Sequence, residues 1–229
     1  MTGKMMTEAA MTDVQDLTLD EVRAALAEGI AANAAFDGWG DDARDMAADA
    51  AGIDRDIARL AFKDGAVAMI DAWFAQIDAV MVESVPVERA AQMKIRQRIT
   101  ALVEARLAAV APNREALRRA LTILAMPQNA ASGARLGWRT VDTIWAQAGD
   151  TATDYNHYTK RATLFAVYAS TIAVFLNDES EDHADTRAFL ARRIDGIMRF
   201  EKWKAGMAKR GENMPSLSRF IGRLRYPAV

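Results

Sequence analysis

Cysteine is absent from the 229 residues of this chain, and histidine occurs only twice, as His157 and His183. The lack of thiols excludes disulfides, thiolate metal sites and a cysteine nucleophile. Two histidines are too few for a di-iron bundle, which needs two Glu-x-x-His motifs, and zinc sites lack enough imidazoles. The chain also lacks a phosphate-binding glycine loop and a serine nucleophile elbow. We therefore predict no metal site, no catalytic residues and no enzymatic activity.

Proline and glycine, the residues that most often interrupt helices, number only five and thirteen. No segment alternates apolar and polar residues as a strand does, and no run approaches the roughly 20 apolar residues of a membrane-spanning helix. The first 17 residues lack the apolar core of a secretion signal and the arginines of a mitochondrial transit peptide. These features predict an all-α protein of the bacterial cytoplasm with no targeting peptide.

Helical periodicity and chain breakers divide the sequence into four parts. Residues 1–17 are expected to form a flexible N-terminus and residues 18–85 a helix-turn-helix-like head. Residues 86–210 are expected to form a helical ligand-binding bundle, and residues 211–229 a linker followed by an amphipathic helix.

Capping residues mark the ends of the predicted helices. In the head, Asp20 is predicted to cap a helix over residues 19–32, Gly52 to end a second helix in a left-handed conformation, and Asp54 to cap a third. In the second part, we expect helices over residues 87–110, 114–125, 130–148, 154–176 and 181–207.

Charge is unevenly distributed along the chain. Residues 1–85 carry six basic and seventeen acidic side chains, a net charge of −11, whereas residues 192–225 have a net charge of +7. The outline of the head resembles the amino-terminal domain of TetR-family repressors. In its candidate recognition helix, residues 54–60, the charges nearly cancel, and a surface this acidic repels DNA. We expect a structural head and no nucleic-acid partner. The alternative is a TetR-like ligand-responsive transcriptional regulator.

A polar and aromatic motif begins at Gly149 and runs Gly-Asp-x-x-x-Asp-x-Asn-x-Tyr-Thr-x-Arg through residue 161. It resembles the signature of the Coq-nine family of ubiquinone-biosynthesis accessory proteins. Residues 94–99, 118–127 and 189–194 agree with the same family, and the likeness covers roughly residues 20 to 226.

The resemblance implies a partner protein, the hydroxylase of demethoxyubiquinone or another hydroxylase of the ubiquinone pathway. The partner-binding residues carried over are Asp154, Asn156, His157, Tyr158 and Arg161. His157 departs from the tryptophan that is common in the family, and imidazole buries less apolar area. For any single aromatic residue of the motif, ordinary core packing is the competing interpretation. The oligomeric state is left open, with a homodimer as one alternative.

The resemblance also implies a lipid-binding protein with no cofactor other than a bound isoprenoid lipid or quinone. It would bind isoprenoid quinone precursors at the membrane and present them to the hydroxylase. The apolar residues predicted to contact the lipid are Leu102, Leu107, Leu121, Leu124, Ile144, Trp145, Leu164, Val167, Tyr168 and Phe175.

The C-terminal segment has the pattern of a helix that lies in a membrane interface. Its apolar residues recur at positions i, i+3, i+4 and i+7, and three arginines accompany them. We expect it to bind anionic lipids and to hold the protein peripherally at the inner membrane. A helix docked on its own bundle is the alternative. The predicted membrane-binding residues are Leu217, Arg219, Phe220, Ile221, Arg223, Leu224 and Arg225.

Overall fold

The computed structural model describes residues 17–150 and 155–212, and every regular element in these ranges is an α-helix or a short 3-10 helix. The predicted all-α fold is therefore confirmed. The α-helices are α2 (Leu19–Asp37), α3 (Asp41–Ala51), α4 (Arg55–Ala61), α5 (Ala66–Ser84), α6 (Val87–Ala91), α7 (Ile95–Val110), α8 (Arg114–Leu124), α9 (Ala130–Gln147), α10 (Tyr155–Phe175) and α11 (Ala184–Glu212). The 3-10 helices are η1 (Ala111–Asn113), η2 (Pro127–Asn129) and η3 (Glu181–His183).

The head begins with a capping box rather than with the predicted cap at Asp20. The Thr18 hydroxyl accepts from the Glu21 N–H, and the Glu21 carboxylate accepts from the Thr18 N–H at 2.8 Å. This reciprocal pairing satisfies two helix-end donors, which Asp20, already inside the helix, does not do. The predicted left-handed end of α3 at Gly52 is confirmed (φ 68°), as is the cap of α4 by Asp54.

A break divides the helix predicted over residues 87–110 into α6 and α7. The backbone of Lys94 is extended at this break, and its N–H donates to the side-chain oxygen of Gln97. This hydrogen bond caps the start of α7 at Ile95. The Arg98 guanidinium donates to the carbonyls of Ala91 and Met93 and so satisfies acceptors at the end of α6. These side chains stabilise a break that hydrophobic periodicity does not reveal.

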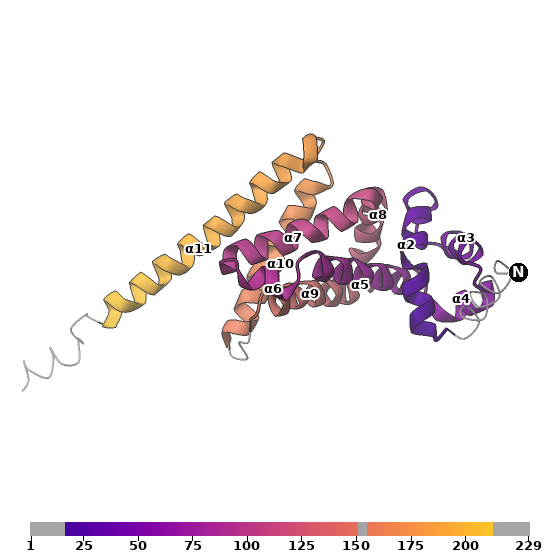
Figure 1. The fold of residues 1–229 in the computed structure, drawn as a ribbon, viewed down its shortest axis with the longest axis horizontal. Coiled ribbons are helices and arrows are strands. Elements are labelled where there is room, and N and C mark those ends of the chain that lie inside the picture. The colour runs from indigo at the N-terminus through magenta and orange to yellow at the C-terminus, as the bar shows by residue number, and fades with distance from the viewer. Residues whose placement is uncertain (1–16, 151–154, 213–229) are drawn as a thin grey trace, which may run out of the picture.

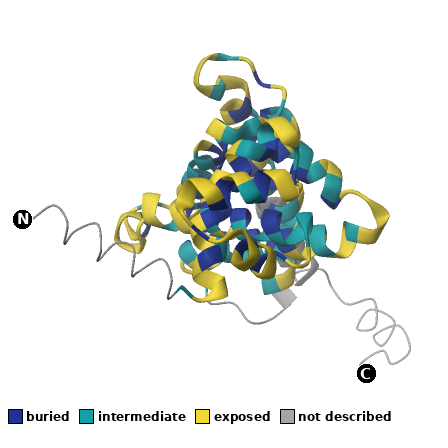
Figure 2. Cartoon of the chain, turned by 90° about the vertical axis from the view of Figure 1, so that its right-hand side faces the viewer, coloured by how far each residue is buried: buried dark blue, intermediate teal, exposed yellow. Residues whose placement is uncertain are grey.

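Helix α5 joins the head to the bundle, because it packs on α2 on one side and on α7 and α9 on the other (Figure 1). The Trp39 indole N–H donates to the Ala116 carbonyl of α8 at 3.0 Å, and its ring lies 5.4 Å from that of Trp73 on α5. Viewed from the head end, buried residues fill the interior between the helices (Figure 2). One hydrophobic core thus runs through both parts, and the boundary at residue 85 stays a prediction.

The last described helix, α11, runs out from the bundle and extends well past the other helices (Figure 1). It continues to Glu212, two residues into the segment predicted as a linker, because one glycine near a helix end costs only about 1 kcal/mol. Among the described helices, none alone has the length and apolarity to cross a membrane. Only α4 and α5 taken together, bent by 86°, meet that test, and α5 supplies much of the core.

Candidate functional site

A cavity of about 420 Å³ opens between α7, the end of α9, α10 and α11. We call it the Trp145 cavity. Apolar side chains from all four helices line its wall, among them Ile99, Trp145, Leu164, Ile194 and Ile197. Its volume is within the range of about 300–1,000 Å³ that is usual for small-ligand sites, and its mixture of apolar wall and few polar groups is also typical of them.

Charged side chains occupy one side of this cavity. The Asp150 carboxylate accepts from Lys160 Nζ at 2.8 Å and from Arg161 Nη1 at 3.2 Å. Lys160 Nζ also lies 5.4 Å from the centre of the Trp145 ring, a cation–π distance. The predicted motif therefore joins the start of α10 to the end of α9 and fixes the position of the tryptophan ring.

Arg98 closes the cavity from the α7 side. Its Nη1 donates to the Ala148 carbonyl at the end of α9, at 2.8 Å. The neighbouring Gly149 has φ +83°, a left-handed conformation that favours glycine. The same arginine thus ends α6 and attaches α7 to α9.

Only two of the ten residues predicted to contact lipid, Trp145 and Leu164, line the Trp145 cavity. The predicted lipid contacts did not include the other residues of its wall, among them Arg98, Ile99, Lys160 and Ile197. Arg98 and Ile194 lay in segments that matched the family, which was a signal for them. Leu107 and Phe175 line a different cavity, and the remaining six, which line neither cavity, are Leu102, Leu121, Leu124, Ile144, Val167 and Tyr168.

Tyr168 packs against a buried charged cluster in the centre of the bundle. Arg106, only 1% exposed, donates to Asp78 Oδ1 at 2.7 Å, to the Thr140 hydroxyl at 3.2 Å and to the Tyr168 hydroxyl. Burial raises the pKa of the Tyr168 phenol, so this side chain remains neutral at physiological pH. The cluster ties α5, α7, α9 and α10 together and occupies the place where the prediction put lipid near Tyr168.

Another cavity, of about 330 Å³, lies between α7 and the corner that joins α10 to α11. Leu107, Phe175 and His183 contribute to its wall, and the His183 ring meets Phe175 edge-on with centres 4.9 Å apart. Asp182 and His183 both have left-handed backbone angles, an uncommon conformation for residues other than glycine. This cavity is smaller and lies apart from the motif of residues 149–161.

The predicted partner-binding residues separate into an exposed and a buried group. Tyr158 is 62% exposed, and its ring lies 6.4 Å from Trp138 and 5.1 Å from His157. Arg161, which was predicted to bind the partner together with Tyr158, is only 4% exposed and is paired with Asp142 at 2.5 Å and with Asp150. Two carboxylates draw its guanidinium inward. Asp154 and the side chain of Asn156 lie outside the described parts of the structure.

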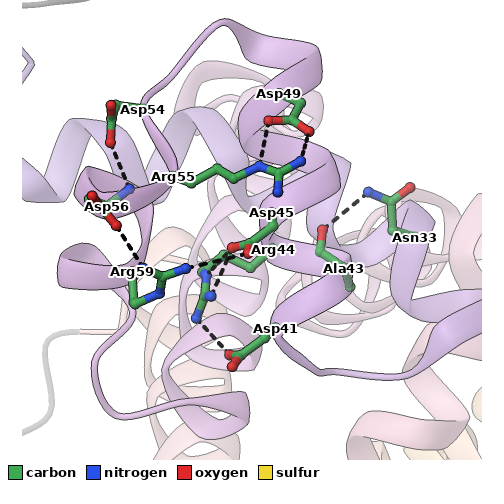
Figure 3. Close-up of polar contacts among 10 residues, drawn as sticks. All are labelled: Asn33, Asp41, Ala43, Arg44, Asp45, Asp49, Asp54, Arg55, Asp56 and Arg59. Carbon is green, nitrogen blue, oxygen red and sulfur yellow. Dashed lines mark hydrogen bonds and ion pairs between the residues drawn. The ribbon is translucent and has the colours of Figure 1, made fainter.

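In the head, aspartates neutralise all three arginines of α3 and α4 (Figure 3). Arg44 pairs with Asp41 and Asp45, Arg55 with Asp49, and Arg59 with Asp56 at 2.6 Å. A DNA-binding helix needs cations that are free to meet phosphates. The arrangement agrees with the expectation of a structural head.

Two further predictions concern the membrane contact and the lack of a metal site. The membrane-binding residues between Leu217 and Arg225 lie outside the described part of the chain. Within residues 17–150 and 155–212, no group of three or more acidic or histidine side chains is placed to hold a metal ion.

Residues 130–201 match the family model described as COQ9. The chain is 41% identical to the human ubiquinone biosynthesis protein COQ9, mitochondrial, over 110 residues, 48% of this chain and 35% of that protein. It is 33% identical to the Xenopus tropicalis protein of the same name over 189 residues, 76% of this chain and 57% of that protein. The chain thus spans less than two thirds of the length of these relatives.

A solved structure has a similar fold. The crystal structure of the TetR transcriptional regulator from Nitrosomonas europaea ATCC 19718 superposes with a TM-score of 0.61, over 76% of this chain and 95% of that one. The sequences are 24% identical, so the likeness concerns the fold alone. It confirms the predicted TetR-like architecture, a helix-turn-helix head on a helical bundle.

Proposed function

We propose that this protein is a lipid-binding accessory protein of ubiquinone biosynthesis, because residues 130–201 match the family model described as COQ9. It binds an isoprenoid quinone precursor in the Trp145 cavity and presents it to a partner hydroxylase, and it catalyses no reaction itself. The relatives that are named as ubiquinone biosynthesis proteins support the pathway.

The Trp145 cavity is the observation that carries this proposal. Three of the helices around it, α9, α10 and α11, fall within the segment that matches the COQ9 model, and Gly149, Asp150, Thr159 and Lys160 of the polar motif line one of its sides. Isoleucine, leucine and tryptophan side chains supply a wall suited to a prenyl chain. Each buried methylene-sized group of such a chain contributes about 0.8 kcal/mol. An apolar ligand of a few prenyl units therefore gains enough free energy to leave water for this site.

The surface around Tyr158 is the proposed docking site for the hydroxylase. An exposed tyrosine with an indole ring beside it offers a large apolar area and a polar hydroxyl, which are typical of interface anchors. The same helix, α10, carries Lys160 and Leu164 into the Trp145 cavity two and six residues further on. A partner bound at Tyr158 is therefore close along the helix to the ligand that it would receive.

The proposed membrane contact is the basic, amphipathic segment from Leu217 to Arg225. Its sequence follows α11, whose residues Ile194 and Ile197 line the Trp145 cavity. An anionic bilayer attracts each arginine by about 1 kcal/mol, while the apolar residues enter the interface. We therefore place the protein peripherally at the inner membrane, where isoprenoid quinones reside.

The regulator alternative is not favoured. The arginines of α3 and α4 are held by aspartates, and Asp42 and Asp54 lie exposed in the same region with no ion pair among the described residues. DNA approaching this face would meet carboxylates first.

Native mass spectrometry of the full chain, with solvent extraction of bound lipid, tests the proposal. We expect the purified protein to carry an isoprenoid lipid, and expect Thr163→Phe, which fills the Trp145 cavity, to lose it. Thr143→Phe is the matched control. Both threonines are half-buried and donate to the carbonyl four residues earlier, but only Thr163 lines the cavity. Wild-type protein that neither carries nor takes up lipid contradicts the proposal, as does a Thr163→Phe variant with a full complement.

A further inference from the structure

Three of the four helices around the Trp145 cavity are tied to one another by polar contacts. Arg98 joins α7 to the end of α9, and Arg161 joins α10 to α9 through Asp142. The buried cluster around Arg106 connects α7 to α9 and α10 a second time. Because these contacts cross between helices and are largely shielded from water, α7, α9 and α10 form a rigid frame around the cavity.

Helix α11, the fourth wall, is held differently. Its described side chains contribute a single row of buried residues, Thr186, Leu190 and Ile194, spaced four apart. Among the described residues, one ion pair joins α11 to α7, between Asp195 and Arg96, and both side chains are about half exposed. Such exposed pairs stabilise a contact only weakly. The remainder of the helix runs out from the bundle (Figure 1).

The seam between α7 and α11 is hollow along its length. The Trp145 cavity adjoins a cavity of about 390 Å³, since Arg96 and Ile194 line both. That cavity in turn adjoins the one beside Phe175, since Glu104 lines both. Close packing supplies the dispersion energy that holds a helix in place, so a row of voids leaves α11 weakly held against α7.

The start of α11, by contrast, is firmly anchored. The Thr186 N–H and hydroxyl both donate to the buried Asp178 carboxylate, at 2.8 Å and 2.5 Å. Asp182 and His183, with their left-handed backbone angles, form the corner just before it. The cavity residue Ile197 lies eleven positions after Thr186, about 16 Å along the axis, so a rotation of about 10° at the start displaces it by about 3 Å.

We propose that α11 is the gate of the Trp145 cavity. It rotates about its anchored start and separates from α7, so that a prenyl chain enters or leaves between the two helices. The ion pair between Arg96 and Asp195 is the latch of the closed state. Opening exposes Leu190 and Ile194, whose burial limits the open state to roughly one molecule in 10² to 10⁴. The inference rests on the proposed lipid-binding function and adds the route of entry and its control.

Thiol reactivity measures the opening without any lipid. Because the chain has no cysteine, Ile194→Cys places a single buried thiol on α11. Ile99→Cys is the matched control, since both isoleucines are 6% exposed and line the same cavity, but Ile99 belongs to the frame. We expect the thiol at position 194 to react with a disulfide reagent about tenfold or more faster, after correction for global unfolding measured in urea. Equal corrected rates overturn the inference.

A reducible crosslink tests whether this opening admits lipid. In the full-length variant Arg96→Cys/Asp195→Cys, a short bis-methanethiosulfonate linker holds the gate closed, and reductant releases it. We expect the linked form to take up and release a dansyl-labelled farnesol about tenfold or more slowly than the reduced form, with an affinity within about twofold. Arg55→Cys/Asp49→Cys is the control, an ion pair of similar exposure in the head, and its linker should leave the rates unchanged.

The outcomes separate the gate from the proposed function. Exchange that the seam linker does not slow overturns the gate. A linker that weakens the affinity as much as it slows uptake acts by filling the cavity, which also contradicts the gate. Failure of the wild-type protein to bind the labelled farnesol counts against the proposed function, whereas the thiol reactivity at positions 194 and 99 still decides whether α11 opens.

Discussion

Replacement of Arg106 by methionine tests whether the centre of the bundle is a structural charge cluster or a site for ligand. Methionine keeps most of the length of the side chain and removes its charge and its donors. The variant leaves Asp78, buried between α5 and α9, without its closest cation. It also removes the hydrogen bonds to Thr140 and Tyr168.

The expected loss follows from the surroundings of the two charges. Removal of one partner from a buried ion pair costs about 3–5 kcal/mol, since the other charge stays buried and unpaired. Arg139 Nε lies 4.0 Å from Asp78 Oδ2 and the Thr140 hydroxyl lies 3.3 Å from it, so part of the Asp78 charge remains compensated. We therefore expect a loss of about 3 kcal/mol, which for a chain of this size lowers Tm by about 6–12 °C.

Urea denaturation followed by circular dichroism measures this loss. Arg59→Met is the control, because the ion pair of Arg59 with Asp56 is exposed and such pairs contribute less than about 1 kcal/mol. The double variant Arg106→Met/Asp78→Asn should recover part of the stability, since it removes the stranded charge. Lipid uptake per folded molecule should not change in either variant. The reasoning is refuted if Arg106→Met is as stable as Arg59→Met, or if it loses its lipid while remaining folded.

Four further results are expected. Tyr158→Ala should weaken the complex with the partner hydroxylase by roughly 1–2 kcal/mol in a calorimetric titration. Phe36→Ala, which removes another exposed aromatic side chain from the distant head, should leave the affinity unchanged. A Tyr158→Ala protein that fails to fold would indicate that Tyr158 has a role in the core instead. The Asp178 carboxylate is buried, which opposes ionisation, but hydrogen bonds from Ser180 and Thr186 outweigh this and hold its pKa below the usual range. The ionised Asp178 carboxylate therefore stabilises the folded state at pH 7, and this stabilisation declines as the pH falls below about 4, the pKa of an aspartate in the unfolded chain. The Tm difference between wild type and Asp178→Asn should accordingly narrow from about pH 7 to about pH 3. A Tm difference that stays constant over this range contradicts the reasoning. Wild-type protein should give no saturable gel shift with DNA at low salt, while replacement of Asp45, Asp49 and Asp56 by asparagine should release Arg55 and Arg59 and produce weak, salt-sensitive binding. Deletion of residues 213–229 should abolish binding to anionic liposomes with the fold intact, and undiminished binding would assign the membrane contact elsewhere.

Local sequence features anticipated much of the fold. The caps at Gly52 and Asp54 and the breaks at Pro86 and Pro112 were readable because each depends on one residue and its immediate neighbours. The relation to the COQ9 family was likewise carried by a short motif, from Gly149 to Arg161. The break between α6 and α7 was missed, because it is stabilised by Arg98 from the following helix and not by a proline or a glycine.

Tertiary packing alone decided which apolar residues line a cavity and which fill the core. Leu102, Ile144 and Leu164 all lie on the apolar faces of their helices, and periodicity treats them alike. The spacing between neighbouring helices leaves a cavity beside Leu164, whereas Leu102 and Ile144 are fully buried in the core. Charge behaved in the same way. Arginine is usually found at the surface, yet the Arg161 side chain is buried, because it pairs with Asp142 and Asp150, which lie eleven or more residues earlier in the chain. A single sequence records which residues are apolar or charged, whereas the partner of each depends on long-range contacts that only the folded chain makes.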